Sequence, residues 1–205
     1  MKKRIGSIIL AAGMAKRMGQ QKLLLPLGEK PLLAHVLQTV SALSWEDCVA
    51  VIGEPEAELT ALCRQYSIRT VANPDRETGQ SSSVRLALRN LSTELDGILF
   101  LLGDQPFLSP LLLQVLAERF SELADNRYIV VPYCQGRRRN PVLFGSFWRS
   151  QLAALQGDRG GRELIEKNPQ WVSRVVWEEE QSFLDADTWE DYELLCAISA
   201  AKSPL

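Results

Sequence analysis

Short apolar runs that alternate with segments of helical periodicity limit the fold of this chain more than any other feature. The strand-like runs lie at residues 5–10, 48–52, 68–72, 98–102 and 128–132. Apolar residues at helical spacing fill the intervals, at residues 31–43, 55–66, 81–91 and 110–123. This alternation predicts an α/β fold of three layers, in which helices cover both faces of a mostly parallel sheet. Ligands are then expected at the carboxyl ends of the strands.

The pattern changes after residue 132. Residues 133–162 are rich in Arg and Gly and predict an antiparallel excursion with loops and short helices. A further strand is expected at residues 171–177 and a closing helix at 187–200, with Asp187 or Thr188 as its N-cap. The chain has 205 residues, 46% of them hydrophobic, which suits one domain over residues 1–205.

The composition argues against several classes of protein. A net charge of −2 and a pI near 5.6 do not suit a nucleic-acid surface. No apolar run approaches the roughly 20 residues that span a membrane, and the run behind the basic start is too short for an export signal, so a cytoplasmic protein is expected. One histidine, His35, and four cysteines without a Cys-x-x-Cys pair argue against a zinc site and for reduced thiols.

The segment that follows the first apolar run is rich in small residues. It begins Leu10-Ala11-Ala12-Gly13 and continues through Arg17 to Lys22. Small residues let the backbone approach a ligand and leave N–H groups free to point at it, while the Arg and the Lys add two permanent cations. This pattern favours nucleotide phosphates as ligand over an ordinary turn with solvated charges. Neither the glycine fingerprint of dinucleotide folds nor a Walker loop is present.

Asp104 comes directly after the apolar run at residues 98–102 and Gly103. It should therefore stand at the carboxyl end of a buried strand, where the ligand is expected. Mg²⁺ prefers carboxylate, water and phosphate oxygens, so one or two aspartates suffice if a nucleotide supplies the rest. The alternative is a helix cap before Pro110, a role for which Ser109 is already well placed.

The motifs together resemble a known family, the nucleotidyltransferases that build dinucleotide forms of the molybdenum cofactor. The resemblance starts at residues 10–22 and continues in family order over most of the chain. Its further blocks are Lys22-Leu23-Leu24-Leu25-Pro26-Leu27, Lys30-Pro31-Leu32-Leu33, Gly79-Gln80-Ser81-Ser82-Ser83, Gly103-Asp104-Gln105-Pro106, Asn140-Pro141-Val142-Leu143-Phe144, Gly157-Asp158-Arg159-Gly160 and Leu184-Asp185-Ala186-Asp187-Thr188. The sequences of several blocks resemble those of the cytidylyltransferase branch more than those of the guanylyltransferase branch, although Gln80 stands where methionine is common.

The resemblance implies a Rossmann-like nucleotidyltransferase fold and assigns roles to named residues. Nucleotide binding falls to Leu10, Ala11, Ala12, Gly13, Arg17, Lys22, Ser81, Ser82, Ser83 and Asp104. Catalysis falls to Lys22, Arg17 and Asp104, with Asp104 and Asp185 holding Mg²⁺ and Asp187 left to cap the last helix. Simple capping roles stay open for the serines and for both late aspartates.

Two basic, glycine-containing loops lie in the second half, at residues 137–140 and 157–162. A second anionic substrate would need such groups, although a solvated basic surface is the ordinary explanation of a charge run. The residues expected to bind this substrate are Arg139, Asn140, Asp158 and Arg159. Residues 133–162 would then form a substrate-side excursion from the domain.

The reaction that the resemblance implies is transfer of CMP from CTP to the phosphate of molybdopterin, which gives the cytosine dinucleotide cofactor and pyrophosphate. The product would serve a molybdenum hydroxylase as partner. The alternatives are the same chemistry with GTP or with a sugar phosphate, and a non-catalytic chaperone that carries the molybdenum cofactor.

Overall fold

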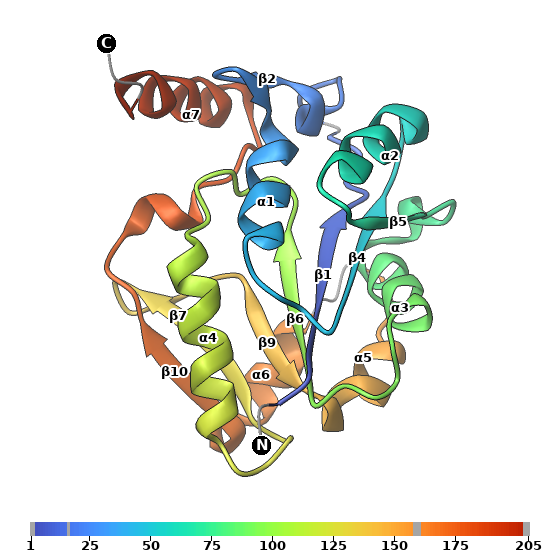
Figure 1. Cartoon of the computed structure of the whole chain (residues 1–205), viewed down its shortest axis with the longest axis vertical. Helices are drawn as coiled ribbons and strands as arrows, with labels where there is room; N and C mark the ends of the chain where they lie inside the picture. Colours follow the sequence, from blue (N-terminus) through green and yellow to red (C-terminus); the bar gives the residue numbers. More distant parts are fainter. Residues whose placement is uncertain (1–2, 16, 158–160, 203–205) are drawn as a thin grey trace.

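The computed structural model of the protein describes residues 3–15, 17–157 and 161–202. Its main sheet has eight strands among these residues (Figure 1). They are β1 (Ile5–Ala11), β4 (Asp47–Ile52), β5 (Arg69–Ala72), β6 (Gly97–Leu102), β7 (Ile129–Cys134), β8 (Arg137–Arg138), β9 (Val142–Gly145) and β10 (Val172–Val176). Two further short strands, β2 (Pro26–Leu27) and β3 (Lys30–Pro31), pair with each other.

Seven α-helices lie in the described part of the chain. They are α1 (Leu32–Ser41), α2 (Glu56–Gln65), α3 (Gln80–Asn90), α4 (Pro110–Glu122), α5 (Arg149–Ala153), α6 (Arg162–Lys167) and α7 (Trp189–Lys202). Single turns of 3-10 helix are η1 (Lys22–Leu24), η2 (Arg76–Thr78), η3 (Ser146–Trp148), η4 (Pro169–Trp171) and η5 (Glu180–Phe183). No helix among the described residues has both the length and the apolar character that a membrane crossing requires.

The sheet is mostly parallel, as predicted. Its strands lie in the order β10-β7-β9-β6-β1-β4-β5, with β8 paired to β7. Every pairing along this order is parallel except the two that β9 makes with β6 and β7. The carboxyl ends of β1, β4, β5 and β6 therefore meet at one edge of the sheet.

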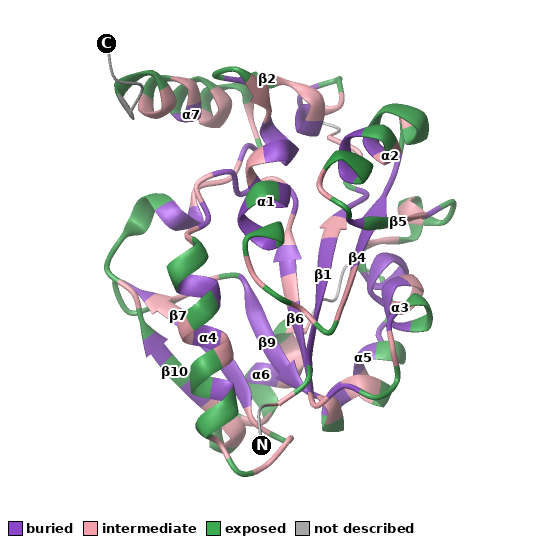
Figure 2. Cartoon of the chain, viewed as in Figure 1, coloured by how far each residue is buried: buried purple, intermediate pink, exposed green. Residues whose placement is uncertain are grey.

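Helices cover both faces and form two separate apolar cores (Figure 2). One core holds the inner sides of α1, α2 and α4, and the other those of α3, α5 and α6. Neighbouring residues of β1 divide between them, because Ile9 faces the first core and Ile8 the second. Both side chains are fully buried, and each such burial stabilises the fold by roughly 1.5–3 kcal/mol. The three-layer α/β/α prediction is confirmed.

The strand that sequence periodicity did not resolve is β9, which lies within residues 133–162. It enters the sheet antiparallel between β6 and β7. Gly145 ends it at a point of very close approach, since a Cβ there would stand 1.9 Å from the backbone oxygen of Asn126. Cys134 is buried at the end of β7.

The last helix, α7, contacts the short hairpin formed by β2 and β3 near the start of the chain. The Tyr192 hydroxyl on α7 donates to the carbonyl of Pro26 in β2. Figure 1 shows α7 and β2 together beyond the carboxyl edge of the central strands. This contact brings the segment before α7 close to the loop that follows β1.

Candidate nucleotide cleft

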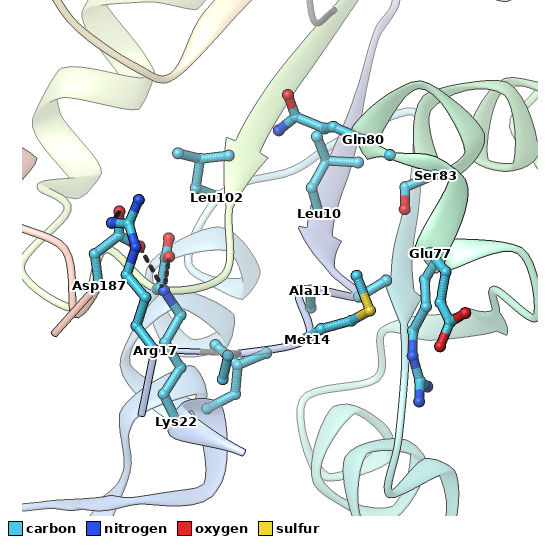
Figure 3. A pocket seen from close by; sticks show the side chains of 17 residues that line it. Leu10, Ala11, Met14, Arg17, Lys22, Glu77, Gln80, Ser83, Leu102 and Asp187 are labelled. Atoms are coloured by element: carbon cyan, nitrogen blue, oxygen red, sulfur yellow. Dashed lines mark hydrogen bonds and ion pairs between the residues drawn. The ribbon is translucent and has the colours of Figure 1, made fainter. Parts of the chain in front are cut away.

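A cleft of about 530 Å³ opens at the carboxyl ends of β1 and β6 (Figure 3). Segments distant in the sequence line it: the loop after β1, η2 with the start of α3, the turn after β6, and the segment before α7. The residues predicted for nucleotide binding that line it are Leu10, Ala11, Ala12, Gly13, Arg17, Lys22, Ser83 and Asp104.

Two turns pack closely at the floor of the cleft. The N–H of Gly103 donates to the carbonyl of Leu10 over 2.9 Å. A Cβ on Gly103 would stand 3.0 Å from the Cβ of Ala11, tighter than an ordinary contact. The small residues at both turns therefore let the two backbones approach each other, and this places Asp104 beside the loop after β1.

Lys22 is the most buried charged group of the cleft. Its Nζ donates to Asp104 Oδ2 over 2.6 Å and to Asp187 Oδ1 over 2.9 Å. Only 10% of its side chain is exposed. Burial lowers the pKa of Lys22, but Asp104 and then Asp187 outweigh this effect and hold the pKa above its usual value. The lysine is therefore a fixed cation between two carboxylates.

Arg17 supplies a second, freer cation. Its Nη1 lies 3.7 Å from Asp187 Oδ2, and both side chains are more than half exposed. Exposed ion pairs of this kind contribute about 0–1 kcal/mol, so little holds the guanidinium in place. Figure 3 shows Arg17, Lys22 and Asp187 on the same side of the cleft.

Asp185 does not line the cleft, although it lies within electrostatic reach of the residues that do. Burial, followed by the charges of Asp104 and Asp187, raises the pKa of Asp185 to about 6, partly offset by Lys22. The structure therefore places three carboxyl groups, those of Asp104, Asp185 and Asp187, near Lys22. The role of Asp185 as second metal ligand stays a prediction.

A divalent cation fits this donor set only with help from the ligand. Among the described residues, no three His, Cys, Asp or Glu side chains converge closely enough to hold a metal by themselves. Hard carboxylate oxygens from Asp104 and one late aspartate, completed by phosphate oxygens, are the set that Mg²⁺ accepts. The carboxylates of Asp104 and Asp187, which together with burial raise the pKa of Asp185, favour such a cation.

The N-cap of α7 is Thr188, one of the two alternatives left open. Its Oγ1 accepts from the N–H of Asp191, and the Asp191 carboxylate accepts from the Thr188 N–H. This reciprocal pair closes the helix end, so Asp187 is free to bind Lys22. At α4 the corresponding Ser109 makes no side-chain cap bond.

Only one of the three predicted serines reaches the cleft. The Ser81 hydroxyl accepts from Arg85, and its N–H donates to Gly157. The Ser82 hydroxyl donates to the carbonyl of Gly79. The helical turn at the start of α3 points these two side chains into the protein, and only Ser83 lines the cleft. Nucleotide contacts through Ser81 and Ser82 are therefore not supported.

A buried amide that sequence analysis did not single out fixes this turn. Asn73, at the end of β5, donates through Nδ2 to both Ser82 and Ser83, each over 2.9 Å. Its N–H donates to the carbonyl of Ile52 at the end of β4. Asn73 thus ties the carboxyl ends of two strands to the first turn of α3.

Three polar residues that the sequence analysis did not assign also line the cleft: Arg76, Glu77 and Gln80. The first two belong to η2, and the last opens α3. Gly79 between them has φ +101°, which accounts for the glycine at this corner. In the sequence, polar residues around a turn glycine could have indicated a binding site here, but this pattern does not show which side chains face the cleft.

Of the two residues predicted to bind the second substrate in the basic loop after β7, only Asn140 lines a cavity near the cleft. Asn140 lines a second cavity of about 370 Å³ beside the cleft. Arg139 faces away from it, 3.6 Å from Glu180 and with its guanidinium over the ring of Phe183. Alternation along the extended chain turns Arg138 into the cavity in its place. The binding role expected for Arg139 therefore stays a prediction, and Asp158 and Arg159 lie outside the described residues.

Other proteins share these features. Residues 7–173 match the model of the MobA-like NTP transferase domain. The chain is 30% identical over 197 residues to the purine catabolism protein PucB of Bacillus subtilis, which covers 92% of this chain and 94% of that protein. It is 28% identical over 204 residues to nicotine blue oxidoreductase of Paenarthrobacter nicotinovorans, covering 93% and 96%.

Solved structures superpose on nearly the whole chain. The crystal structure of a Mycobacterium tuberculosis Rv0371c homologue from Mycobacterium sp. strain JC1 superposes with a TM-score of 0.86 at 27% identity, covering 99% of this chain and 100% of that one. Rv0371c of M. tuberculosis H37Rv in complex with manganese gives 0.81 at 25% identity, covering 95% and 98%.

Replacing Thr188 tests the cap that frees Asp187. Thr188→Ala is expected to lower the free energy of unfolding by about 1 kcal/mol, because the Asp191 N–H loses its partner. The matched variant Ser109→Ala removes a hydroxyl that makes no cap bond at α4, so its loss should be clearly smaller. Urea unfolding of both variants measures the difference, and equal losses would contradict the assignment.

Proposed function

Because the chain belongs to the family of MobA-like NTP transferase domains, we propose that it transfers CMP from CTP to the phosphate of molybdopterin. The products are the cytosine dinucleotide form of the cofactor and pyrophosphate. The observation that carries the proposal is the convergence of Lys22 and Asp104 at the loop after β1. A fixed cation beside a carboxylate at a strand end suits a nucleotide triphosphate.

The acceptor is already an anion, so the transfer requires no general base. An oxygen of the acceptor phosphate attacks the α-phosphorus of CTP, and the bond from that phosphorus to the bridging oxygen of the β-phosphate breaks. Lys22 neutralises charge on the triphosphate and on departing pyrophosphate. Arg17 is exposed enough to turn onto the outer phosphates. Alignment and charge neutralisation then supply the catalysis.

Asp104 and Asp185 are proposed to hold Mg²⁺ together with the phosphates. When bound, the cation neutralises phosphate oxygens and orients the α-phosphorus for in-line displacement. Asp187 binds Lys22 and so positions this cation, while its exposed pair with Arg17 leaves that guanidinium free to move.

The base is proposed to lie against the loop after β1 and the first turn of α3. Gln80 and Ser83 line the cleft there and offer donors as well as acceptors. A pyrimidine edge can be read by such groups together with the backbone at Ala11 and Ala12. The preference for CTP rests on this and on the resemblance of the motifs to cytidylyltransferases.

The acceptor is proposed to lie in the second cavity, next to Asn140. That cavity shares Leu10, Gln80 and Leu102 with the nucleotide cleft, so an acceptor there adjoins the α-phosphate. Described residues between 138 and 152, with Gly161 and Arg162, supply much of its lining. Residues 133–162 are proposed to act as a substrate-side excursion. The product is proposed to pass to a molybdenum hydroxylase in the cytoplasm, where the four free cysteines stay reduced.

The base preference is tested by competition. With molybdopterin, Mg²⁺ and equal CTP and GTP, the cytosine dinucleotide is expected to predominate, because buried partners left unpaired by the wrong base discriminate by as much as about 10⁴. Chromatography of the dinucleotide products measures the ratio. An excess of the guanosine dinucleotide would overturn the preference for CTP but leave the transfer reaction standing.

If product formed only with a sugar phosphate, molybdopterin would not be the acceptor. Binding of molybdopterin without release of pyrophosphate would indicate a non-catalytic carrier.

Lys22→Ala is expected to cost about 2–4 kcal/mol of transition-state stabilisation, by analogy with removal of one preorganised electrostatic donor. The reason is the loss of a fixed charge where negative charge develops. Single-turnover kinetics and CTP titration measure the effect on rate and affinity. Lys30→Ala is the matched control, since its ammonium binds Gln38 on α1 and does not line the cleft. Unchanged rate and affinity in Lys22→Ala would refute the role.

The roles of Asp185 and Asp187 are distinguished by comparing variants in which the carboxylate is replaced by a neutral amide. Asp104→Asn and Asp185→Asn are expected to abolish pyrophosphate release and to weaken Mn²⁺ binding, used as a paramagnetic probe in the presence of CTP. Asp187→Asn should slow transfer with little change in Mn²⁺ affinity, because it acts through Lys22 and Arg17. Thermal melting checks that all three fold. Normal Mn²⁺ affinity in Asp185→Asn with a loss in Asp187→Asn would exchange their roles.

A further inference from the structure

Asn73 and Ser83 form a buried contact behind the α3 wall of the nucleotide cleft. The two residues are 3% and 6% exposed, and the side chain of Ser83 lines the cleft. Figure 3 shows Ser83 and Lys22 on opposite sides of the cleft. Since Lys22 is proposed to contact the triphosphate, the base at the other end of the nucleotide is expected on the side of Ser83. What Ser83 offers to a base depends on where its hydroxyl proton points.

The hydrogen bonds of Asn73 fix which way its side-chain amide faces. Its Oδ1 accepts from the backbone N–H of Asp75 over 2.9 Å, and an N–H group can only donate. A rotation of the amide by 180° would therefore set two donors against each other at Asp75. The amide nitrogen must face the serines, and Nδ2 donates to the Oγ atoms of both Ser82 and Ser83. Both serine oxygens are thus held as acceptors toward Asn73.

The single proton of each serine hydroxyl must then point elsewhere. Ser82 Oγ donates its proton to the carbonyl of Gly79 over 2.8 Å. This carbonyl is the acceptor that a helical serine at position 83 would otherwise use, but it also accepts from the Ser82 N–H. Both acceptor positions of the Gly79 carbonyl are therefore occupied. The described residues give the Ser83 hydroxyl no acceptor, so its proton is directed into the cleft.

A serine hydroxyl held in this way presents a donor to the ligand. A donor suits an unprotonated ring nitrogen, such as N3 of cytosine. It is opposed by the N3–H of uracil and by the N1–H of guanine, because two donors would then face each other. The rings of cytosine and uracil have the same size, so at this atom they differ in the direction of the hydrogen bond and not in shape.

We propose that Asn73 is a positioning residue for base recognition, which directs the hydroxyl proton of Ser83 toward N3 of cytosine and so selects CTP over UTP. This rests on the proposed function for the place of the base against the first turn of α3. It adds a residue that determines specificity without touching the nucleotide, since Asn73 does not line the cleft and acts through Ser83.

Nucleotide binding tests the proposal without any transfer. Isothermal titration calorimetry in the presence of Mg²⁺ at pH 8 gives the dissociation constants of CTP and of UTP, and the quantity compared is their ratio. The unmodified protein is expected to bind CTP at least about tenfold more tightly than UTP, the equivalent of one hydrogen bond. Ser83→Ala removes the donor and is expected to bring the two affinities close together.

Asn73→Asp reverses the polarity of the contact without changing its shape. The new carboxylate still accepts from the Asp75 N–H, but it has no proton to donate and accepts from the Ser83 hydroxyl instead. Ser83 then presents a lone pair to the base, so the preference for CTP is expected to vanish or to turn toward UTP. The added charge weakens both nucleotides and cancels in the ratio. Asn73→Ala, a second variant without added charge, should lower the ratio toward that of Ser83→Ala.

Asn90→Asp is the matched control on the same helix. Nδ2 of Asn90 donates to the carbonyl of Leu86 at the other end of α3, outside the cleft, so both affinities should stay unchanged. The double variant of Asn73→Asp with Ser83→Ala should show the same ratio as Ser83→Ala alone, because the hydroxyl through which Asn73 acts is missing. Thermal melting checks that each variant folds.

The binding ratio and the product assay fail in different ways. Equal weakening of CTP and UTP in both Asn73 variants, with the ratio kept, would indicate a structural role and overturn the proposal. Equal affinities of the unmodified protein would overturn it as well, while pyrophosphate release with molybdopterin would still establish the proposed reaction. A CTP preference that is lost in Asn73→Asp and kept in Asn90→Asp, without transfer to molybdopterin, would support the role of Asn73 and overturn the reaction. Absence of nucleotide binding would overturn both.

Discussion

The ammonium of Lys22, held between Asp104 and Asp187, is the interaction on which the geometry of the cleft depends. It joins three segments that are far apart in the sequence: the loop after β1, the turn after β6 and the segment before α7. Asp104 and Asp187 lie outside helices and strands, and Lys22 begins the single 3-10 turn η1. A charged group that is 10% exposed keeps its charge only if partners surround it, so the contact also specifies how the segments meet.

The same contact sets the electrostatics of ligand binding. Lys22 is neutralised by carboxylates before any ligand arrives, and Asp185 lies behind them with its pKa raised to about 6, first by burial and then by Asp104 and Asp187. A polyphosphate alone would add negative charge to a region that already repels it. Together with a divalent cation it exchanges one set of anionic partners for another, and Lys22 changes partner with little cost in solvation. Metal and nucleotide are therefore expected to bind as a unit.

The sequence predicted the parts of the structure that local pattern determines. Apolar periodicity located β1, β4, β5, β6 and β7 to within about two residues, and the apolar run before Gly103 predicted that Asp104 stands at the carboxyl end of a buried strand. Facing directions that depend on tertiary contacts were not predictable. Ser81 and Ser82 turn inward because Arg85, Gly79 and Gly157 bind them. Arg138, not Arg139, faces the second cavity because β8 pairs with β7 and fixes the alternation. Asn73 acts through partners that lie on a different element, so no local pattern marks it.

Strand β9 lies between two regions of the molecule. The nucleotide cleft is built entirely from one side of it, by segments that follow β1, β5 and β6 and by the residues before α7. A hollow that includes Arg137, Arg138, Arg162 and Arg174 in its lining is built from the other side, by β7, β8, β10 and α6. Under the proposed function, substitutions in this second region can change the acceptor that is recognised without disturbing the residues that line the nucleotide cleft. Two proteins that inherit the same nucleotide half can therefore diverge in the partner molecule they accept, through changes confined to a stretch of about fifty residues after β6 and α4.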